Sequence, residues 1–305
     1  MSVIGIDTSN YTTSIAYFDG ETGENCSRLL PVKPGELGLR QSDAVFAHTK
    51  SLPELSGRLF CNVNEQITAI GVSTRPRTVE GSYMPCFMVG LSHGKLLSDL
   101  LHVPMYEVSH QQGHVAASLW SAGRLDLMDK AHLAWHLSGG TTELLLVEPE
   151  GKNVKCTRIG GTTDISAGQL IDRTGVMLEL PFPAGKHVDA LSQQSATQDL
   201  FKVKCPEMEF SFSGVQNKVE QYHLTHSPED TAGFALRCIC HAVYQATCNA
   251  LKAYPGLEVV FSGGVASNSM LREKLKPLNP VFSKPEFSTD NAMGVAVLAH
   301  RLREE

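Results

Sequence analysis

The sequence predicts an α/β fold built from two lobes, and three observations support this. The chain has 305 residues, whereas a single domain usually contains about 100–150 residues. Short apolar runs that are typical of strands alternate with longer segments of helical character, which favours a partly parallel sheet covered by helices. A motif of strand, polar tip and strand also occurs twice. We therefore expect two lobes of one design at residues 1–122 and 123–305, with the last helix free to pack on the first lobe.

The first predicted hairpin opens the chain. Val3–Thr8 and Thr13–Phe18 are apolar runs, and the polar residues Ser9 to Thr12 lie between them. This pattern predicts two antiparallel strands whose turn presents hydroxyl and amide groups. The other elements of this lobe are predicted as a helix at 44–59, a strand at 67–73, a helix at 88–101 and a strand at 105–108.

The second predicted hairpin repeats the design. Leu133–Leu137 and Glu143–Val147 flank the polar tip Ser138-Gly139-Gly140-Thr141-Thr142, and a third strand is predicted at 154–159. The chain then becomes more helical. We expect helices at 166–178, 215–223 and 231–254, a strand at 258–262, and closing helices.

The composition narrows the class of protein. Apolar residues make up 42% and charged residues 19% of the chain, as in an ordinary globular protein. No apolar stretch approaches the ~20 residues that cross a bilayer, so we expect a cytoplasmic protein without membrane contact. The eight cysteines include no CxxC pair, and we interpret them as reduced thiols. A net charge of −6 means that a local patch or a partner would have to supply the basic surface for any bound RNA.

One segment has the spacing of a metal site. Residues 109–114 read Ser-His-Gln-Gln-Gly-His, Ser109 is a good helix N-cap, and histidines four residues apart lie on one helical face. His110 and His114 can therefore share a metal ion; the alternative is two surface or capping histidines. A metallopeptidase of the HExxH type is disfavoured, because Gln111 replaces the glutamate that would act as base.

Two glycine turns each follow an apolar strand, at Ser138-Gly139-Gly140 and Ser262-Gly263-Gly264. Glycine lets the backbone approach a phosphate and offer its amides to oxygen atoms. The second turn leads through Asn268 into a predicted helix, whose N-terminus favours negative charge. Together with the tip at Thr8 and Ser9, these turns predict a nucleotide clamp of three loops. Simple turn chemistry is the alternative.

A further group of acids and glycines follows the second hairpin, and it consists of Asp164, Gly168, Asp172, Gly185 and Asp189. Carboxylates there can accept hydrogen bonds from ribose hydroxyls or hold a hydrated cation. A solvated helix face followed by a turn explains the same spacing. The sequence pattern leaves both interpretations open.

Seven motifs in order resemble the TsaD family, which is also called the glycoprotease family. They are Gly5 to Ser9, Ser109 to His114, Leu137 to Leu144, Asp164 to Arg173, Phe210 to Gly214, Ser262 to Asn268, and Phe287 to Asn291. The resemblance extends over nearly the whole chain. It implies an actin-like ATPase (ASKHA) fold, in which two ribonuclease-H-like lobes enclose a nucleotide and metal cleft.

The resemblance also implies the residues of a site. His110, His114 and Asp290 would hold one Fe2+ or Zn2+ ion, and catalytic roles are implied for Asp7, Thr8, Ser9 and Asp164. ATP or threonylcarbamoyl-adenylate would be the bound nucleotide, with Mg2+ as a companion ion. Positions implied to bind it are His136, Leu137, Ser138, Gly139, Gly140, Thr141, Asp172, Gly185, Asp189, Gly263, Gly264 and Asn268.

The implied reaction moves the threonylcarbamoyl group from its adenylate to the N6 amine of the adenosine 3′ of the tRNA anticodon. The implied partners are tRNA and proteins like TsaB and TsaE. Because the mixed anhydride is already activated, positioning supplies most of the rate gain.

Several positions depart from the family pattern. The hairpin turn reads Asn10-Tyr11-Thr12-Thr13 where the family has Cys-Asp-Glu-Thr, and Arg75-Pro76-Arg77-Thr78 replaces a glycine-rich loop. Thr141, Ile165 and Gln169 replace a histidine, an aspartate and a glutamate. These departures keep a second hypothesis open, namely a nucleotide-binding paralogue that acts as a carbamoyltransferase on another acceptor or as a regulatory subunit.

Overall fold

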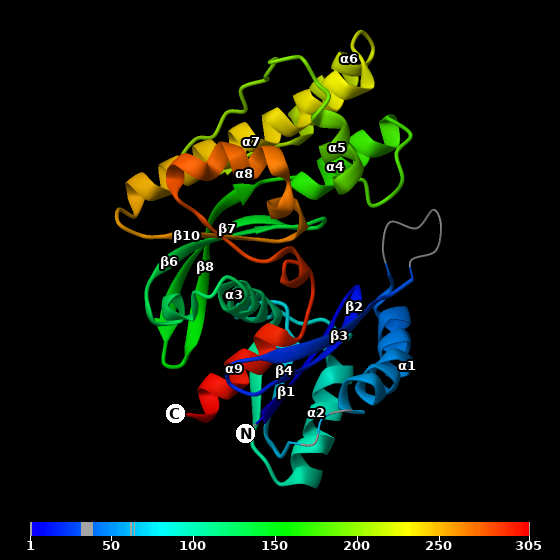
Figure 1. The fold of residues 1–305 in the computed structure, drawn as a ribbon, viewed down its shortest axis with the longest axis vertical. Coiled ribbons are helices and arrows are strands. Elements are labelled where there is room, and N and C mark those ends of the chain that lie inside the picture. Colours follow the sequence, from blue (N-terminus) through cyan, green and yellow to red (C-terminus); the bar gives the residue numbers. More distant parts are fainter. Residues whose placement is uncertain (1, 32–38, 62, 64, 305) are drawn as a thin grey trace. The chain divides into compact units, whose positions relative to one another are not determined.

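The computed structural model describes residues 2–31, 39–61, 63 and 65–304, and the chain forms two compact units (Figure 1). Unit 1 comprises Met1–Lys130, Glu148–Cys156 and Asp290–Glu305, and unit 2 comprises Ala131–Val147 and Thr157–Thr289. The first unit thus extends beyond residue 122, and it also takes in a short middle segment and the last helix. The chain therefore leaves unit 1, builds unit 2, and returns to finish unit 1.

The sheet of unit 1 has the strand order β3-β2-β1-β4-β5. Its strands are β1 (Ser2–Ser9), β2 (Thr12–Phe18), β3 (Gly23–Leu29), β4 (Ile67–Arg75) and β5 (Met105–Ser109). β1 and β2 form the antiparallel hairpin that the sequence predicts, and β1, β4 and β5 are parallel. The expectation of a partly parallel sheet is confirmed for this unit.

Alternation along β1 divides its side chains between two helix layers. Ile4 and Ile6 pack with residues of α1 (Gln41–Phe60) and α2 (Phe87–Leu101). Val3 instead packs with Ala299 of α9 (Met293–Arg303), and α9 lies beside α3 (His110–Ser121) (Figure 1). Asp7 is on the same face of the strand as Val3, so its side chain points toward the α3 and α9 layer.

Unit 2 repeats the sheet design. Its strands follow the order β11-β10-β6-β7-β8-β9, and without the edge strand β9 this order matches that of unit 1. The strands are β6 (His132–Leu137), β7 (Thr142–Glu150), β8 (Asn153–Thr162), β9 (Glu209–Phe210), β10 (Val259–Ser262) and β11 (Val281–Phe282). The C-terminal end of β7 and the N-terminal end of β8 belong to unit 1.

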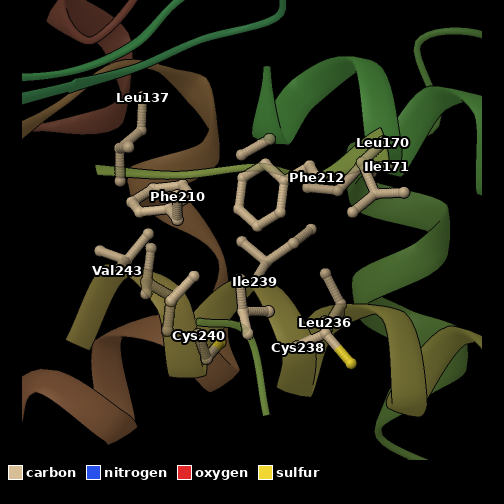
Figure 2. Close-up of a cluster of buried hydrophobic side chains, with 14 of the residues drawn as sticks. Leu137, Leu170, Ile171, Phe210, Phe212, Leu236, Cys238, Ile239, Cys240 and Val243 are labelled. Atoms are coloured by element: carbon tan, nitrogen blue, oxygen red, sulfur yellow. The ribbon is translucent and has the colours of Figure 1, made fainter. Parts of the chain in front are cut away.

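The helices of unit 2 enclose its main hydrophobic core (Figure 2). Leu137, at the end of β6, and Phe210, in β9, lie among side chains of α7 such as Val243 (Figure 2). This core fixes the start of the glycine turn that follows Leu137. The helices are α4 (Ala167–Met177), α5 (Gly185–Ser192), α6 (Ser213–His223), α7 (Pro228–Ala253) and α8 (Ser269–Leu275).

Short 3-10 helices complete the described part of the chain, at Leu125–Asp129, Gly264–Ser267, Lys276–Leu278 and Pro285–Phe287. The sequence patterns did not predict β3, β9, β11 or α5, which are short or half-exposed. Among the described residues, no helix is long and apolar enough to span a bilayer.

Candidate metal site and glycine turns

Helix α3 begins where the sequence predicts. The Ser109 hydroxyl accepts a hydrogen bond from the Gln112 backbone N–H at 3.2 Å, and the Gln112 side-chain oxygen accepts one from the Ser109 N–H at 2.8 Å. This reciprocal cap satisfies two donors at the helix start. It places His110 in the first turn and His114 one turn later, on one face.

A close helix crossing brings the third residue of the candidate site to these histidines. Helices α3 and α9 meet at Gly113 and Gly294, where a Cβ on Gly294 would lie 1.8 Å from the Gly113 carbonyl oxygen. Only glycine permits this approach of the two backbones. Asp290 precedes α9 by one turn and therefore reaches the imidazoles on either side of Gly113.

The three side chains converge on one point. The two imidazole Nε2 atoms of His110 and His114 are 2.9 Å apart. The Asp290 Oδ1 atom lies 3.6 Å from the first and 3.2 Å from the second. Ligands about 2.0 Å from a tetrahedral ion stand roughly 3.3 Å from one another. The spacing of these atoms therefore fits a divalent metal, and the three ligands leave open positions for substrate oxygens.

Asp7 contacts the ring of His110 on the side opposite the candidate ligand atom Nε2. Its Oδ2 atom lies 2.8 Å from the Nδ1 atom of His110, and its side chain is only 1% exposed. With the Nδ1 proton shared with a carboxylate, the Nε2 lone pair of His110 is directed at the other two ligand atoms. Carboxylates that orient metal-binding histidines in this way are common in metalloproteins.

Charge in the site is balanced between two acids and the imidazoles. Burial opposes protonation of His110, but the carboxylates of Asp7 and Asp290 outweigh it and raise the pKa of this imidazole to about 10. Burial would also raise the pKa of each carboxyl, yet His110 keeps the pKa of Asp7 and of Asp290 below the usual range. A cation is therefore favoured here, and a metal ion would displace the His110 proton.

The hairpin tip beside Asp7 is held mainly by structural hydrogen bonds. The Thr8 hydroxyl donates to the Cys86 carbonyl at 3.0 Å and accepts from the Gly90 N–H at 3.1 Å, which anchors the start of α2. The Ser9 N–H donates to Asp7 at 3.0 Å. The Ser9 hydroxyl is buried and has no partner among the described residues.

The polar tip is also tied to helix α1. The Asn10 side-chain oxygen accepts a hydrogen bond from Gln41 at 2.5 Å. The buried His48 lies with its Nδ1 atom 2.8 Å from the Thr13 hydroxyl, and burial lowers the pKa of this imidazole. The sequence patterns did not single out His48, although a histidine on the apolar face of a predicted helix was available as a signal.

In unit 2 the first glycine turn is shaped by α4. The Ser166 hydroxyl donates to the Gly139 carbonyl at 2.6 Å, and the Ser138 hydroxyl accepts from the Thr141 N–H at 3.0 Å. Gly139 and Gly140 are exposed. Their N–H groups donate no hydrogen bond to any residue that the structure describes, so they are available to an oxyanion.

The second glycine turn packs against the first strand of the unit. Gly263 has a φ of +90°, and a Cβ there would lie 2.1 Å from the Leu137 carbonyl oxygen. His136 is half-buried, with its Nδ1 atom 3.5 Å from the Ser262 hydroxyl. Gly264 has open space around its Cα. The ends of β6 and β10 thus carry the two turns side by side, as their parallel pairing requires.

The side chains of Asp189 and Asn268 bind each other at 3.0 Å. Asn268 also accepts from the Leu271 N–H at 2.9 Å and caps α8 as the sequence pattern indicates. Asp189 accepts further hydrogen bonds from the backbone and hydroxyl of Ser269. Both side chains are therefore used to join α5 to α8.

Asp172 and Asp164, the other two acids of unit 2 that the sequence patterns singled out, have different surroundings. Burial raises the pKa of Asp172, whose carboxylate accepts from the Ala184 N–H at 2.9 Å next to the open Gly185. Asp164 accepts from the N–H groups of Phe212 at 2.8 Å and Ser213 at 3.1 Å. Burial alone would raise the pKa of Asp164, but these bonds and the Ser211 hydroxyl hold it well below its usual value.

The residues singled out in the sequence thus fall into separate groups within each unit. His110, His114 and Asp290 meet in unit 1 and Asp7 joins them. Thr8 and Ser9 lie beside this group, whereas the glycine turns and Asp164, Asp172, Asp189 and Asn268 belong to unit 2. The contact between Asp7 and His110 was not foreseen, because it joins residues 103 positions apart in the sequence.

Comparison with solved structures identifies the fold. The chain is similar to HypF in its phosphate- and nucleotide-bound form, with a TM-score of 0.64 at 14% identity over 100% of this chain and 47% of that chain. It is similar to a ROK hexokinase from Thermus thermophilus, with a TM-score of 0.55 at 15% identity over 100% of both chains. At such low identity these likenesses concern the fold alone, and they confirm the actin-like ATPase class.

Comparison with known sequences identifies the family. A relative named tRNA N6-adenosine threonylcarbamoyltransferase from Thermosipho africanus is 30% identical over 99% of this chain and 94% of its own length. A relative of the same name from Kosmotoga olearia is 35% identical over 70% of this chain and 66% of its own length. The family model described as "TsaD: tRNA N6-adenosine threonylcarbamoyltransferase" matches residues 38–297, and this chain therefore belongs to the TsaD family.

Proposed function

We propose that this chain transfers the threonylcarbamoyl group from threonylcarbamoyl-adenylate to the N6 amine of the adenosine 3′ of the tRNA anticodon. The observation that carries the proposal is the convergence of His110, His114 and Asp290 within a chain that belongs to the TsaD family. A site of this kind carries an energetic cost, because the buried carboxylate of Asp7 and the half-buried carboxylate of Asp290 both need a cation nearby.

The metal ligands in this proposal are His110, His114 and Asp290. Imidazole and carboxylate ligands suit both Fe2+ and Zn2+, and three ligands leave positions for oxygens of the donor. A bound ion would act as a Lewis acid toward the phosphate or carbonyl oxygens of the adenylate. Asp7 has a positioning role, since it fixes the ring of His110 and holds the Nδ1 proton.

The nucleotide in this proposal is bound by unit 2. The unengaged N–H groups of Gly139 and Gly140 suit phosphate oxygens, and the half-buried carboxyl of Asp172 beside Gly185 suits a ribose hydroxyl. Gly263, Gly264, His136 and Thr141 surround the same strand ends. Asp164 and the pair Asp189 and Asn268 support these loops through the hydrogen bonds described above, so we assign them structural roles within the site.

The transfer itself needs little covalent help from the protein. A bond forms between N6 of the adenosine and the carbamoyl carbon, the bond from that carbon to the phosphate oxygen breaks, and AMP and one proton leave. Because AMP is a good leaving group, the gain comes from holding the amine against the carbamoyl carbon.

We further propose that the protein works in the cytoplasm with tRNA and with proteins like TsaB and TsaE. The net charge of −6 supports a role for partners, because a chain with an excess of acids supplies little attraction for the phosphate backbone of RNA.

The test is reconstitution with threonylcarbamoyl-adenylate, an unmodified tRNA that carries the target adenosine, and the partner proteins. Mass spectrometry of the digested tRNA is expected to show threonylcarbamoyladenosine with the wild-type chain and none with His110→Ala. Absence of the modified nucleoside with partners that are active in a control system would reject the proposal.

A second candidate function is carbamoyl transfer to an acceptor other than tRNA. It is favoured by the hairpin tip, where Asn10 is bound to Gln41 and the two acids of the family turn are replaced by Tyr11 and Thr12. A screen of small amines with the same donor would separate the candidates. A threonylcarbamoylated amine, formed together with AMP in the absence of tRNA, would favour this second function.

A further inference from the structure

The segment from the last residue of β4 to the start of α2, residues 75–86, lies beside the candidate metal site at both of its ends. We call it the arginine loop. At its start, Arg75 pairs with Ser109 across the β4 and β5 ladder, and the Pro76 carbonyl accepts from the Gln111 N–H at 3.0 Å. The segment that carries Arg75 and Arg77 therefore runs along the first turn of α3, directly beside His110.

The far end of the arginine loop returns to the same place. The Cys86 carbonyl accepts from the Thr8 hydroxyl at 3.0 Å, and the ring of Phe87, which begins α2, lies 6.1 Å from the ring of His110. Both ends of the loop are thus fixed to the residues that surround the candidate metal ligands. The loop therefore starts and ends beside this site.

The loop carries positive charge that no acid neutralises at Arg75. Within the part of the chain that the structure describes, the Arg75 guanidinium has one partner, the Thr74 hydroxyl at 3.3 Å. Glu80 is the one acid of the loop, and it forms no hydrogen bond or ion pair with any described residue. The N-terminus of α3 adds positive potential at the same end of the loop. The N–H donors of the planar Arg75 guanidinium are therefore available to a planar oxyanion such as a carboxylate.

The backbone beside Arg75 is irregular in a way that suits a binding role. The pairing register shifts between Ser73 and Arg75, so that Thr74 is an extra residue in β4. Bulges of this kind occur next to active sites, where they redirect a side chain at a strand end. The family pattern that the sequence resembles has a glycine-rich loop here, and this chain departs from it with Arg75.

The chemistry of the donor supplies a matching group. Threonylcarbamoyl-adenylate carries one free carboxylate, which is separated from the carbamoyl carbon only by the nitrogen and the α-carbon of threonine. A donor whose carbonyl and phosphate oxygens lie at the metal ligands therefore carries this carboxylate a short distance away. Arginine binds carboxylates with two parallel hydrogen bonds, which gives both affinity and orientation.

We propose that Arg75, with Arg77 beside it in the arginine loop, binds the free carboxylate of the threonyl group of the donor. The inference rests on the proposed function, since it names the same donor. It assigns the choice of acyl group to a loop in which this chain departs from the family pattern. A donor without a carboxylate next to the carbamoyl nitrogen would be a poor substrate for this chain.

The test is a double-mutant cycle between protein and ligand, measured by isothermal titration with metal-loaded protein. The ligands are two non-hydrolysable sulfamoyl analogues of the donor, one built on threonine and one on 1-amino-2-propanol, which lacks only the carboxylate. For the wild type, removal of the carboxylate is expected to weaken binding about 10- to 100-fold. Arg75→Gln is expected to bind both analogues with the weaker affinity, and Arg75→Lys, which keeps the charge without the fork, with an intermediate one.

Matched controls separate this effect from a loss of structure. Arg58→Gln removes an exposed arginine of α1 and is expected to bind both analogues like the wild type. Metal content and melting temperature report whether Arg75→Gln has folded with its site intact. If Arg75→Gln fails either check, the test uses Arg75→Lys, in which removal of the carboxylate is expected to weaken binding less than it does in the wild type.

The outcomes distinguish this inference from the proposed function. One outcome is that the wild type modifies tRNA while the losses of binding free energy caused by Arg75→Gln and by removal of the carboxylate simply add. In that case the inference is wrong and the proposed function stands. If Arg75→Gln weakens the binding of tRNA alone, Arg75 contacts RNA phosphate and the inference is equally overturned. If the wild type binds neither analogue and transfers nothing, both fall together.

Discussion

Units 1 and 2 share the order of five strands, but the tips of their first hairpins differ in chemistry. In unit 1 the tip is surrounded by buried charged side chains, with Asp7 behind His110. In unit 2 the equivalent tip is a pair of exposed glycines, whose N–H groups have no partner among the described residues. In the proposed function, one scaffold thus offers a cation a site made of side chains and offers an oxyanion a site made of backbone.

The difference follows from what each ligand needs. A divalent ion is held by lone pairs at about 2 Å, and imidazole and carboxylate side chains reach that distance from several elements. A phosphate is larger and accepts hydrogen bonds, so bare backbone amides suffice if no Cβ blocks the approach. We therefore expect side-chain substitutions to disable unit 1 and backbone-altering substitutions to disable unit 2.

The largest effect is expected for removal of a metal ligand in unit 1. His110→Ala deletes one of three ligands, so the purified variant should lose stoichiometric metal, and tRNA modification should fall at least about 1,000-fold. Elemental analysis and a modification assay measure these effects. His102→Asn removes an exposed imidazole in unit 1 and should change neither. Normal metal content in His110→Ala would show that the ion is bound elsewhere.

The next effect concerns the support behind the ligand. Asp7→Asn keeps the size of the side chain but removes the charge that fixes His110, and metal affinity should fall about 10- to 100-fold. A competition titration with a chelator measures this change. Asp99→Asn, which alters an exposed acid of α2, serves as the control. Unchanged affinity in Asp7→Asn would mean that the carboxylate has no part in metal binding.

In unit 2 the sensitive feature is backbone conformation. Gly263→Ala places a Cβ against the Leu137 carbonyl at a φ of +90°, so the free energy of unfolding should fall by about 2 kcal/mol. Gly264→Ala, next in the chain, has open space around its Cα and should be close to neutral. Urea unfolding of both variants tests the contrast. Equal stability of the two variants would contradict the inference that the turn requires glycine at position 263.

The smallest effect is expected for Asp164, which holds the start of α6. Its lowered pKa means that its contribution to stability is fully present above the ordinary carboxyl value near ~3.9 and is lost as the pH falls through the lowered value. Asp164→Asn should therefore cost about 1 kcal/mol at pH 7. The difference from the wild type should shrink in acid, as measured by urea unfolding at several pH values.

Glu220→Gln changes an exposed charge on the same helix and should show no such pH dependence. A deficit of Asp164→Asn that stays constant from neutral to strongly acid pH would mean that the lost interaction is not ionic.

Features set by neighbouring residues could be predicted from the sequence. The hairpins, the cap at Ser109 and the helical spacing of His110 and His114 depend on residues within one turn or one strand of each other. The strand β3 was missed because Gly23–Leu29 has no apolar alternation. It is set by the turn at Asp19, which accepts from the Thr22 N–H, and an Asp-Gly pair after an apolar run was a usable signal.

Features set by tertiary contact could not be predicted from local patterns. Asp7 and His110 are 103 residues apart, and their contact depends on sheet register and on the layer in which α3 lies. Asp290 joins them because two glycines let α3 and α9 cross closely, and no periodicity of the chain indicates which helices meet. For Asp290, the resemblance to a family supplied what physical patterns could not.

The return of α9 to unit 1 has a consequence for synthesis on the ribosome. His110 and His114 emerge before unit 2 is translated, whereas Asp290 and the helix that covers Gly5 and Ala69 emerge after it. Unit 1 therefore cannot complete the proposed metal site until unit 2 has been made, although domains usually fold in the order of their synthesis. If the proposed ion binds, its capture is a late step in maturation, and a nascent chain cut short before Asp290 would carry both histidines and no complete binding site.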